Sequence, residues 1–203
     1  MKLFVGISAA SGQIYAGRLL KALAADDHEV TVCFSSGAIE VIRAEDLVLL
    51  DLAEAPREKV TDAFLKHHGL SSAGLKIAAP DDMSNAFASG SSLADAAIVC
   101  PCSMSSIGSM AAGITRNLIH RAADVMLKEG RPLVVVPRET PLSEIHLENM
   151  LRLKRAGALI VPAMPGFYHN PETIEQLVDF VVGKIMDLLG IDHDLFERWQ
   201  GQA

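Results

Sequence analysis

The sequence predicts an α/β fold in one domain, built on a doubly wound parallel sheet. The first observation is the order strand, small-residue loop, helix and strand at the start of the chain, over 2–8, 9–12, 13–25 and 29–35. Such a βαβ unit implies parallel strands. The second is that strand-like and helix-like segments continue to alternate through the 203 residues, without an internal repeat or a linker. Half of the residues are apolar, which is enough for a sizeable core.

The later elements follow from hydrophobic spacing and from helix start and stop signals. Ser103 can cap a helix, and Gly130 can end one. The segment 172–190 has the spacing of a long amphipathic helix, and a proline-rich loop over 163–171 precedes it. We expect further strands at 76–79, 96–100, 132–137 and 158–162, and helices at 38–45, 57–68, 93–95, 104–112, 117–130 and 143–156.

Charge and hydropathy limit the class of partner. We expect residues 1–190 to form the domain and 191–203 to be a C-terminal tail around Trp199, packed on a neighbour or frayed. A net charge of -7 argues against nucleic acid as the main partner. No apolar run approaches the roughly 18 residues that cross a bilayer, so no membrane partner is expected.

The cysteines and histidines do not suggest a metal site. Cys33, Cys100 and Cys102 lack the spacing of a structural disulfide or a zinc site, and we interpret them as small buried hydrophobic residues. An odd cysteine number fits a reducing, cytoplasmic location. The seven histidines show no metal-ligand spacing, and His67 and His68 are adjacent and cannot share a helical face.

Two small-residue segments follow predicted strands. Gly6–Gly12 stands where a dinucleotide fingerprint would stand, although it is not G-x-G-x-x-G. Its small side chains allow a ligand near the backbone, and the helix that follows attracts phosphate, so a phosphate or flavin site competes with a simple tight turn. The second segment contains Ser103, Ser105 and Ser106. Helix capping explains only the first of these serines.

The segment 116–138 is positively charged, with five basic and two acidic residues, in a chain of net charge -7. Arg121 and Lys128 are seven residues apart on one helix, hence on one face. A phosphate grip and a solvated face both fit them. Arg138 and Glu139 end a strand, at the edge where α/β sheets bind ligands. Glu139 can act as an acid or a base, or pair with Arg138.

Linked motifs along nearly the whole chain resemble the flavin prenyltransferase family, whose members are UbiX-like proteins sometimes described as aromatic acid decarboxylases. The motifs are Ala10-Ser11-Gly12-x-x-Tyr15, Ala88–Ser91, Cys100–Ser103, Asn117-Leu118-Ile119-x-Arg121–Val125, Leu127–Glu129, Pro137–Leu142, Ile145–Met150 and Met164–Tyr168. The resemblance implies a Rossmann-like flavoprotein that transfers a dimethylallyl group from dimethylallyl phosphate to N5 and C6 of reduced FMN. Phosphate is released, no metal is needed, and the prenylated FMN serves a partner decarboxylase.

The resemblance also implies roles for particular residues. Ala9, Ala10, Ser11, Gly12, Ser35, Ser103, Met104, Ser105, Ser106 and Arg138 would hold FMN. Ser89, Gly90, Ser91, Arg121, Lys128, Glu139, Tyr168 and Lys184 would surround the prenyl phosphate. Ser11, Glu45, Glu139, Arg121 and Lys128 would carry the catalysis, with Glu45 in proton handling. A homo-oligomer, a dodecamer by resemblance, would place these sites at subunit contacts.

Three residues depart from the family pattern. Ala9 adds a methyl group where the family has glycine, close to the expected flavin. Lys184 replaces an arginine and so lacks the bidentate fork, which leaves open whether the donor is a monophosphate or a diphosphate. Met83 replaces an aromatic residue and makes one wall of the prenyl pocket more pliable. None of the three removes a charge that the chemistry needs.

Two other functions compete with prenyl transfer. An FMN-dependent cysteine-type decarboxylase would share the fold but needs a histidine base and a Pro-Ala-Ser-Ala-Asn-Thr type of loop, where this chain has Pro101–Ser106. A non-catalytic FMN carrier or chaperone for a decarboxylase would bind FMN and turn nothing over. The set Arg121, Lys128, Arg138 and Glu139 favours catalysis over the carrier.

Overall fold

The computed structural model describes residues 1–45, 54–71 and 74–198. Its six strands form one parallel sheet in the order β3-β2-β1-β4-β5-β6. The strands are β1 Lys2–Ile7, β2 Glu29–Phe34, β3 Lys76–Ala78, β4 Ala96–Cys102, β5 Leu133–Pro137 and β6 Leu159–Ile160. This order is that of the doubly wound Rossmann sheet, so the expected single-domain Rossmann-like fold is confirmed.

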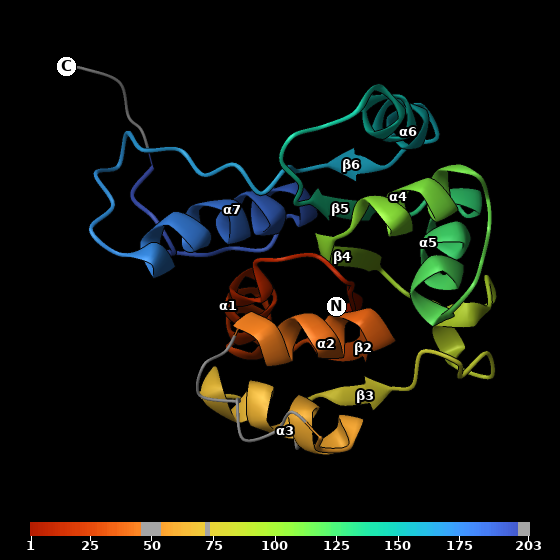
Figure 1. Cartoon of the computed structure of the whole chain (residues 1–203), viewed down its shortest axis with the longest axis horizontal. Coiled ribbons are helices and arrows are strands. Elements are labelled where there is room, and N and C mark those ends of the chain that lie inside the picture. Colours follow the sequence, from red (N-terminus) through yellow and green to blue (C-terminus); the bar gives the residue numbers. More distant parts are fainter. Residues whose placement is uncertain (46–53, 72–73, 199–203) are drawn as a thin grey trace.

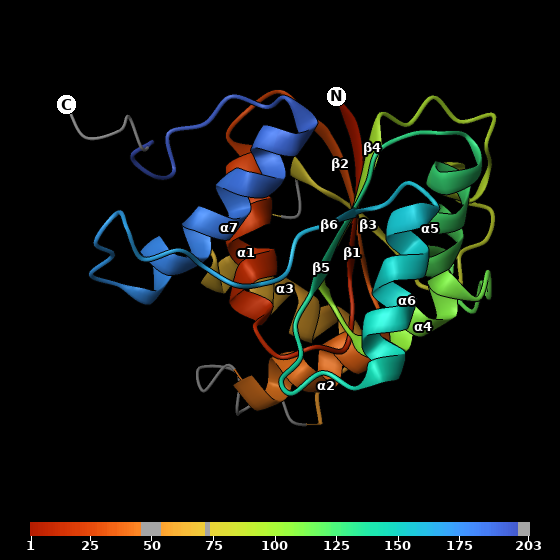
Figure 2. The same ribbon diagram turned by 90° about the horizontal axis from the view of Figure 1, so that it is seen from above.

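Helices cover both faces of the sheet, as Figures 1 and 2 show. One face carries α1 Gln13–Ala24, α2 Ser36–Glu45, α3 Arg57–His67 and α7 Ile174–Leu189. The other carries α4 Met104–Ala111, α5 Leu118–Lys128 and α6 Glu144–Arg155. Each central strand is apolar on both sides, since it feeds one core on each face. No described helix is long and apolar enough to cross a membrane.

Most predicted elements occur within two or three residues of their expected bounds, but the helix expected at 93–95 is wrong. Asp95 instead enters β4 in extended form, because its amide donates to Lys2 O (2.9 Å) and its carboxylate accepts from Lys2 N (2.6 Å). These bonds place the segment beside the start of β1. The short helix of this region is the 3₁₀ turn η3, Ala86–Ala88, where Asn85 caps Phe87 N.

The three cysteines are buried thiols, as expected. Burial raises the pKa of Cys33 to about 12 and the pKa values of Cys100 and Cys102 still further. They are therefore protonated and unreactive at neutral pH. Residues 191–198 lie against α7, while Trp199 falls outside the described residues. The domain boundary at residue 190 stays a prediction.

Candidate functional site

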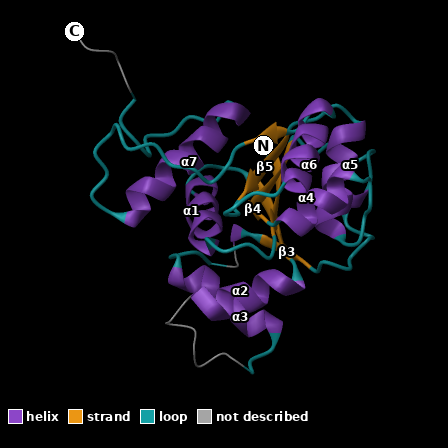
Figure 3. Cartoon of the chain, turned by 45° about the horizontal axis from the view of Figure 1, so that its top comes forward, coloured by secondary structure: helices purple, strands orange, loops and turns teal. Residues whose placement is uncertain are grey.

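The connections that follow β1 and β4 lie on opposite faces of the sheet, so the topological switch point is between these two strands. β1 leads into α1 on one face, and β4 leads into α4 on the other. Figure 3 shows α1 and α4 on opposite sides of the sheet. Ligands of open α/β sheets bind at such a switch point, outside the carboxyl ends of the strands. The loops that meet there are 8–12, after β1, and the start of α4 at Ser103.

Two polar side chains that the sequence did not single out fix these loops. The Ser8 hydroxyl donates to Pro101 O (3.1 Å) and accepts from Ser103 N (2.8 Å), so it joins the end of β1 to the end of β4. The Gln13 amide donates to Ser8 O (3.1 Å) and Ala10 O (2.7 Å). Both residues are buried. Their positions on either side of the small-residue loop 9–12 were the signal in the sequence that could have identified them.

Glu45 lies at the N-terminus of α1. Its carboxylate accepts from Gly12 N (2.7 and 3.0 Å) and from Gln13 N (2.9 Å). Gly12 has φ +92°, a backbone conformation that favours glycine, and this turns its amide toward the carboxylate. Glu45 therefore satisfies the first N–H groups of α1, and two other helices begin at this edge.

Those helices are α2 and α4. Ser35 Oγ accepts from Ala38 N (3.0 Å), next to the start of α2. Ser103 Oγ accepts from Ser106 N (3.2 Å) and caps α4 as expected, while the Ser106 hydroxyl pairs with Ser103 (3.2 Å). Ser105 is exposed and Met104 is buried. The two serine-capped N-termini thus present hydroxyl and amide groups on the two sides of the switch point.

Arg138 joins the third strand end to this edge. Its amide donates to Cys102 O (3.2 Å), and its guanidinium Nε donates to Ser11 O (2.9 Å). The Glu139 carboxylate accepts from Thr140 N (3.1 Å), and no ion pair with Arg138 occurs among the described residues. The structure therefore brings Ala9, Ala10, Ser11, Gly12, Ser103 and Arg138 together, with Ser35 and Glu139 at the same edge.

The second predicted group surrounds α5. Arg121 Nε donates to Ala88 O (2.9 Å), and its Nη1 pairs with Asp124 (2.6 Å). Lys128 pairs with Glu129, and a Cβ on Gly90 would lie 2.6 Å from Lys128 Nζ. Ser89 and Ser91 share a hydrogen bond in the same loop (2.8 Å). These residues therefore come together, but Lys128 ends α5 close to the amino end of β5, away from the Arg138 edge.

Tyr168 and Lys184 belong to a third group, on the face that carries α1 and α7. The Tyr168 ring lies edge-on to Phe180 (5.5 Å between centroids). Lys184 lies on α7 with its Nζ 3.5 Å from Asp187 Oδ2. The sheet stands between this group and α5 (Figure 2). One chain therefore does not bring together all the residues predicted to surround the phosphate.

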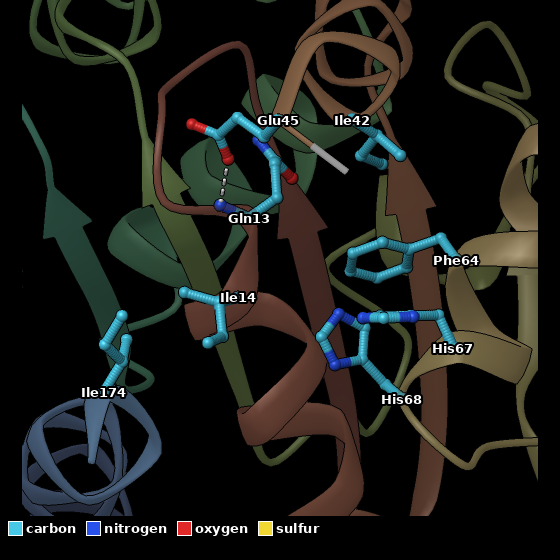
Figure 4. Close-up of a pocket in the computed structure, with 8 residues that line it drawn as sticks. All are labelled: Gln13, Ile14, Ile42, Glu45, Phe64, His67, His68 and Ile174. Atoms are coloured by element: carbon cyan, nitrogen blue, oxygen red, sulfur yellow. Dashed lines mark hydrogen bonds between the residues drawn. The ribbon is translucent and has the colours of Figure 1, made fainter. Parts of the chain in front are cut away.

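A pocket of about 330 Å³ opens on the α1 side of Glu45 (Figure 4). Apolar side chains of α1, α2, α3 and α7 line it together with Gln13, Glu45 and the His67–His68 pair. Sequence spacing did not predict that these histidines face a pocket. Among the described residues, no group of His, Cys, Asp and Glu side chains could hold a metal ion.

The sheet is Rossmann-like, and a small-residue loop and two serine-capped helices lie at its switch point. These features place the chain in the class of flavin- and nucleotide-binding α/β proteins. A family model described as Flavoprotein matches residues 1–186. A flavin prenyltransferase UbiX of Pseudomonas aeruginosa is 44% identical over 202 residues, covering 99% of this chain and 95% of that protein.

Two solved structures are similar over their full length. AnUbiX (PadA1) in complex with FMN and dimethylallyl pyrophosphate has a TM-score of 0.85 at 38% identity, covering 100% of this chain and 98% of that one. A dodecameric FMN-dependent UbiX-like decarboxylase of Escherichia coli O157:H7 has a TM-score of 0.85 at 40% identity, covering 99% and 100%. The chain belongs to the flavin prenyltransferase (UbiX) family of flavoproteins, as the motifs predicted.

Proposed function

We propose that this protein is a flavin prenyltransferase that moves a dimethylallyl group from dimethylallyl phosphate to N5 and C6 of reduced FMN and releases phosphate. The observation that carries the proposal is the edge where Ser11, Ser103 and Arg138 meet, in a chain that belongs to this family. Reduced FMN supplies the nucleophilic ring atoms when it is bound. The chain's own residues bind, orient and neutralise charge.

The residues at the switch point fit a flavin phosphate and ring. A Cβ on Gly37 would lie 2.6 Å from the Ala9 Cβ, so the β1 loop and the start of α2 approach closely, with only small side chains between them. We assign FMN binding to 9–12, Ser35, 103–106 and Arg138. Since Arg138 Nε is held by Ser11 O, its guanidinium is already fixed at this edge before a ligand arrives.

The donor phosphate leaves as an anion, so its departure needs cations and hydrogen-bond donors. We assign this role to Arg121 and Lys128, with Ser89, Gly90 and Ser91 beside them, and to Tyr168 and Lys184. Glu139 is assigned a hydrogen bond or proton transfer to the leaving phosphate, and Glu45 with Ser11 the proton handling near the flavin. Because the sheet separates α5 from α7 within one chain, we infer that these groups meet between subunits of a homo-oligomer.

Anaerobic incubation with reduced FMN and dimethylallyl phosphate, followed by mass spectrometry of the flavin, tests the proposal. A second arm with the diphosphate decides the donor, which the lysine at 184 leaves open. We expect prenylated flavin from the wild type and at least a tenfold lower rate for Glu139→Gln, with Glu144→Gln on the exposed first turn of α6 as the control. Unmodified flavin from a folded, FMN-loaded protein would contradict prenyl transfer and favour the carrier.

We further propose that the product serves a decarboxylase that depends on prenylated FMN. The experiment mixes the reaction product with such a decarboxylase in its flavin-free form and measures carbon dioxide release from an aromatic acid. Decarboxylation that requires both the donor and this protein supports the proposal, and its absence with confirmed prenylated flavin contradicts it.

A further inference from the structure

The C-terminal segment 191–198 folds back onto α7 beside Lys184. Its Phe196 and His193 side chains sit on Gly183, where an added Cβ would lie 2.4 Å from Phe196 Cε1 and 2.6 Å from His193 Cε1. Ile191 is buried at the start of the segment. A side chain at position 183 would therefore push the segment away from α7, and glycine permits the close packing.

This packing places the Lys184 ammonium over two aromatic rings. Its Nζ lies 5.2 Å from the centroid of Phe196 and 5.7 Å from that of Phe180. Both distances are within the range of a cation–π interaction. Phe180 in turn carries the Tyr168 ring on its edge and the His169 ring stacked on its face, 5.5 Å away in both cases. One aromatic cluster thus supports both residues assigned to the phosphate on this face.

Asp187 is the acidic neighbour of Lys184, and the C-terminal segment engages it. Arg198 donates to both Asp187 oxygens (2.7 and 3.3 Å), His193 Nε2 lies 3.2 Å from Oδ1, and Lys184 Nζ forms a longer ion pair with Oδ2 (3.5 Å). The Arg198 guanidinium lowers the pKa of Asp187, so this carboxylate is ionised at neutral pH. The bidentate contact with Arg198 is shorter than the ion pair with Lys184, so the carboxylate is shared and neutralises the lysine only in part.

We propose that residues 191–198 are a positioning element of the donor phosphate site: Phe196 holds the Lys184 ammonium, and Arg198 shares Asp187, so that this carboxylate neutralises the lysine only in part. The inference rests on the proposed function, because it takes Lys184 as a phosphate ligand. Arg198 and Phe196 are positioning residues, since they act through Lys184 and need no contact with the donor.

The test measures binding of dimethylallyl phosphate to the FMN-loaded protein by calorimetry, together with kcat and KM for prenylation. In Arg198→Ala, Asp187 loses its closest partner and pairs more fully with Lys184. We expect Kd and KM to rise about three- to fivefold with kcat unchanged, the scale of one exposed ion pair. Adding Asp187→Asn removes the competing charge and restores the affinity. Arg155→Ala, an exposed arginine in the last turn of α6, is the matched control.

Phe196→Leu provides an independent variant that keeps an apolar side chain on Gly183 and removes the ring. We expect the same direction of change in Kd, with FMN binding unaltered. Unchanged Kd in both Arg198→Ala and Phe196→Leu overturns the inference, as does a failure of Asp187→Asn to restore affinity. Binding needs no turnover, so a wild type that binds the donor without forming prenylated flavin contradicts the proposed function alone.

Discussion

At the residue scale, Ala9 and Gly37 form a complementary pair. The motif resemblance implies a glycine where this chain has Ala9. The Ala9 methyl group points at Gly37, where an added Cβ would lie 2.6 Å from it. Real Cβ atoms do not approach so closely, and neither partner has a flexible end that could move aside. The glycine at 37 therefore leaves room for the Ala9 methyl group of the β1 loop.

Gly37→Ala tests this pairing. We expect the clash to push the β1 loop away from α2, lowering FMN affinity about tenfold and stability by about 1–3 kcal/mol, the usual cost of overpacking. The double variant Ala9→Gly/Gly37→Ala should recover most of both losses. FMN titration followed by fluorescence, and urea denaturation, measure the two effects. Equal losses in the single and double variants would contradict the pairing.

Glu45 shows what a sequence withholds at this scale. As a lone carboxylate it had no interpretation from spacing, and the family resemblance alone suggested a role near Ser11. In the structure it accepts hydrogen bonds from Gly12 and Gln13, 33 and 32 residues away. A contact of that separation depends on how α2 packs beside α1, which no local pattern encodes. Ser103, by contrast, was predictable, since capping is a contact over three residues.

At the scale of elements, α5 contains a buried histidine that couples stability to pH. His120 is 5% exposed, and burial, helped by the charge of Arg116, lowers its pKa below the usual 6.5. The unfolded chain therefore binds a proton more readily than the folded one below that pH. The contribution of His120 to the free energy of unfolding is fully present above about pH 6.5, and it is lost as the pH drops toward the folded-state pKa.

His120→Leu should flatten this dependence. We expect the wild type to lose stability between pH 7 and pH 5, at up to about 1.4 kcal/mol per pH unit for one proton, and the variant to lose less. Urea denaturation at a series of pH values measures both slopes. His120→Asn also lacks the titratable imidazole, so comparison of the two variants separates the effect of titration from that of packing. A wild-type slope retained in both variants would assign the effect to other groups.

The elements themselves were largely predictable because their signals are local. Alternating apolar segments with glycine, proline and serine at their ends fix where strands and helices begin and stop, as for α5 with Asn117 as its N-cap. The segment 93–95 failed because its backbone bonds to Lys2, more than 90 residues away. Tertiary hydrogen bonds of this kind override a weak helical pattern.

At the scale of the whole molecule, the division of the predicted site by the sheet leads to a complementation experiment. Arg121→Ala and Lys184→Ala are each expected to be inactive. If the two groups come from different subunits, mixed oligomers contain some sites with both groups intact, about a quarter under random exchange. Co-expression of differently tagged variants, purification by both tags and a prenylation assay measure this recovery.

Activity in the mixed oligomer, together with inactivity in a mixture of two Lys184→Ala preparations, supports a composite site. No recovery in oligomers of confirmed mixed composition would show that one chain supplies both groups. The motifs identified these residues but not their partners, because sequence position does not tell which subunit a side chain faces.

The hydroxyl of Ser8 has a consequence for how a ligand enters. Because it ties the end of β1 to Pro101 and Ser103, the two walls of the switch point are joined before anything binds. Because the two loops are already held together, they lose little conformational entropy when a ligand binds. More of the contact energy therefore appears as affinity. Preorganisation of the proposed flavin site thus begins with one buried side chain.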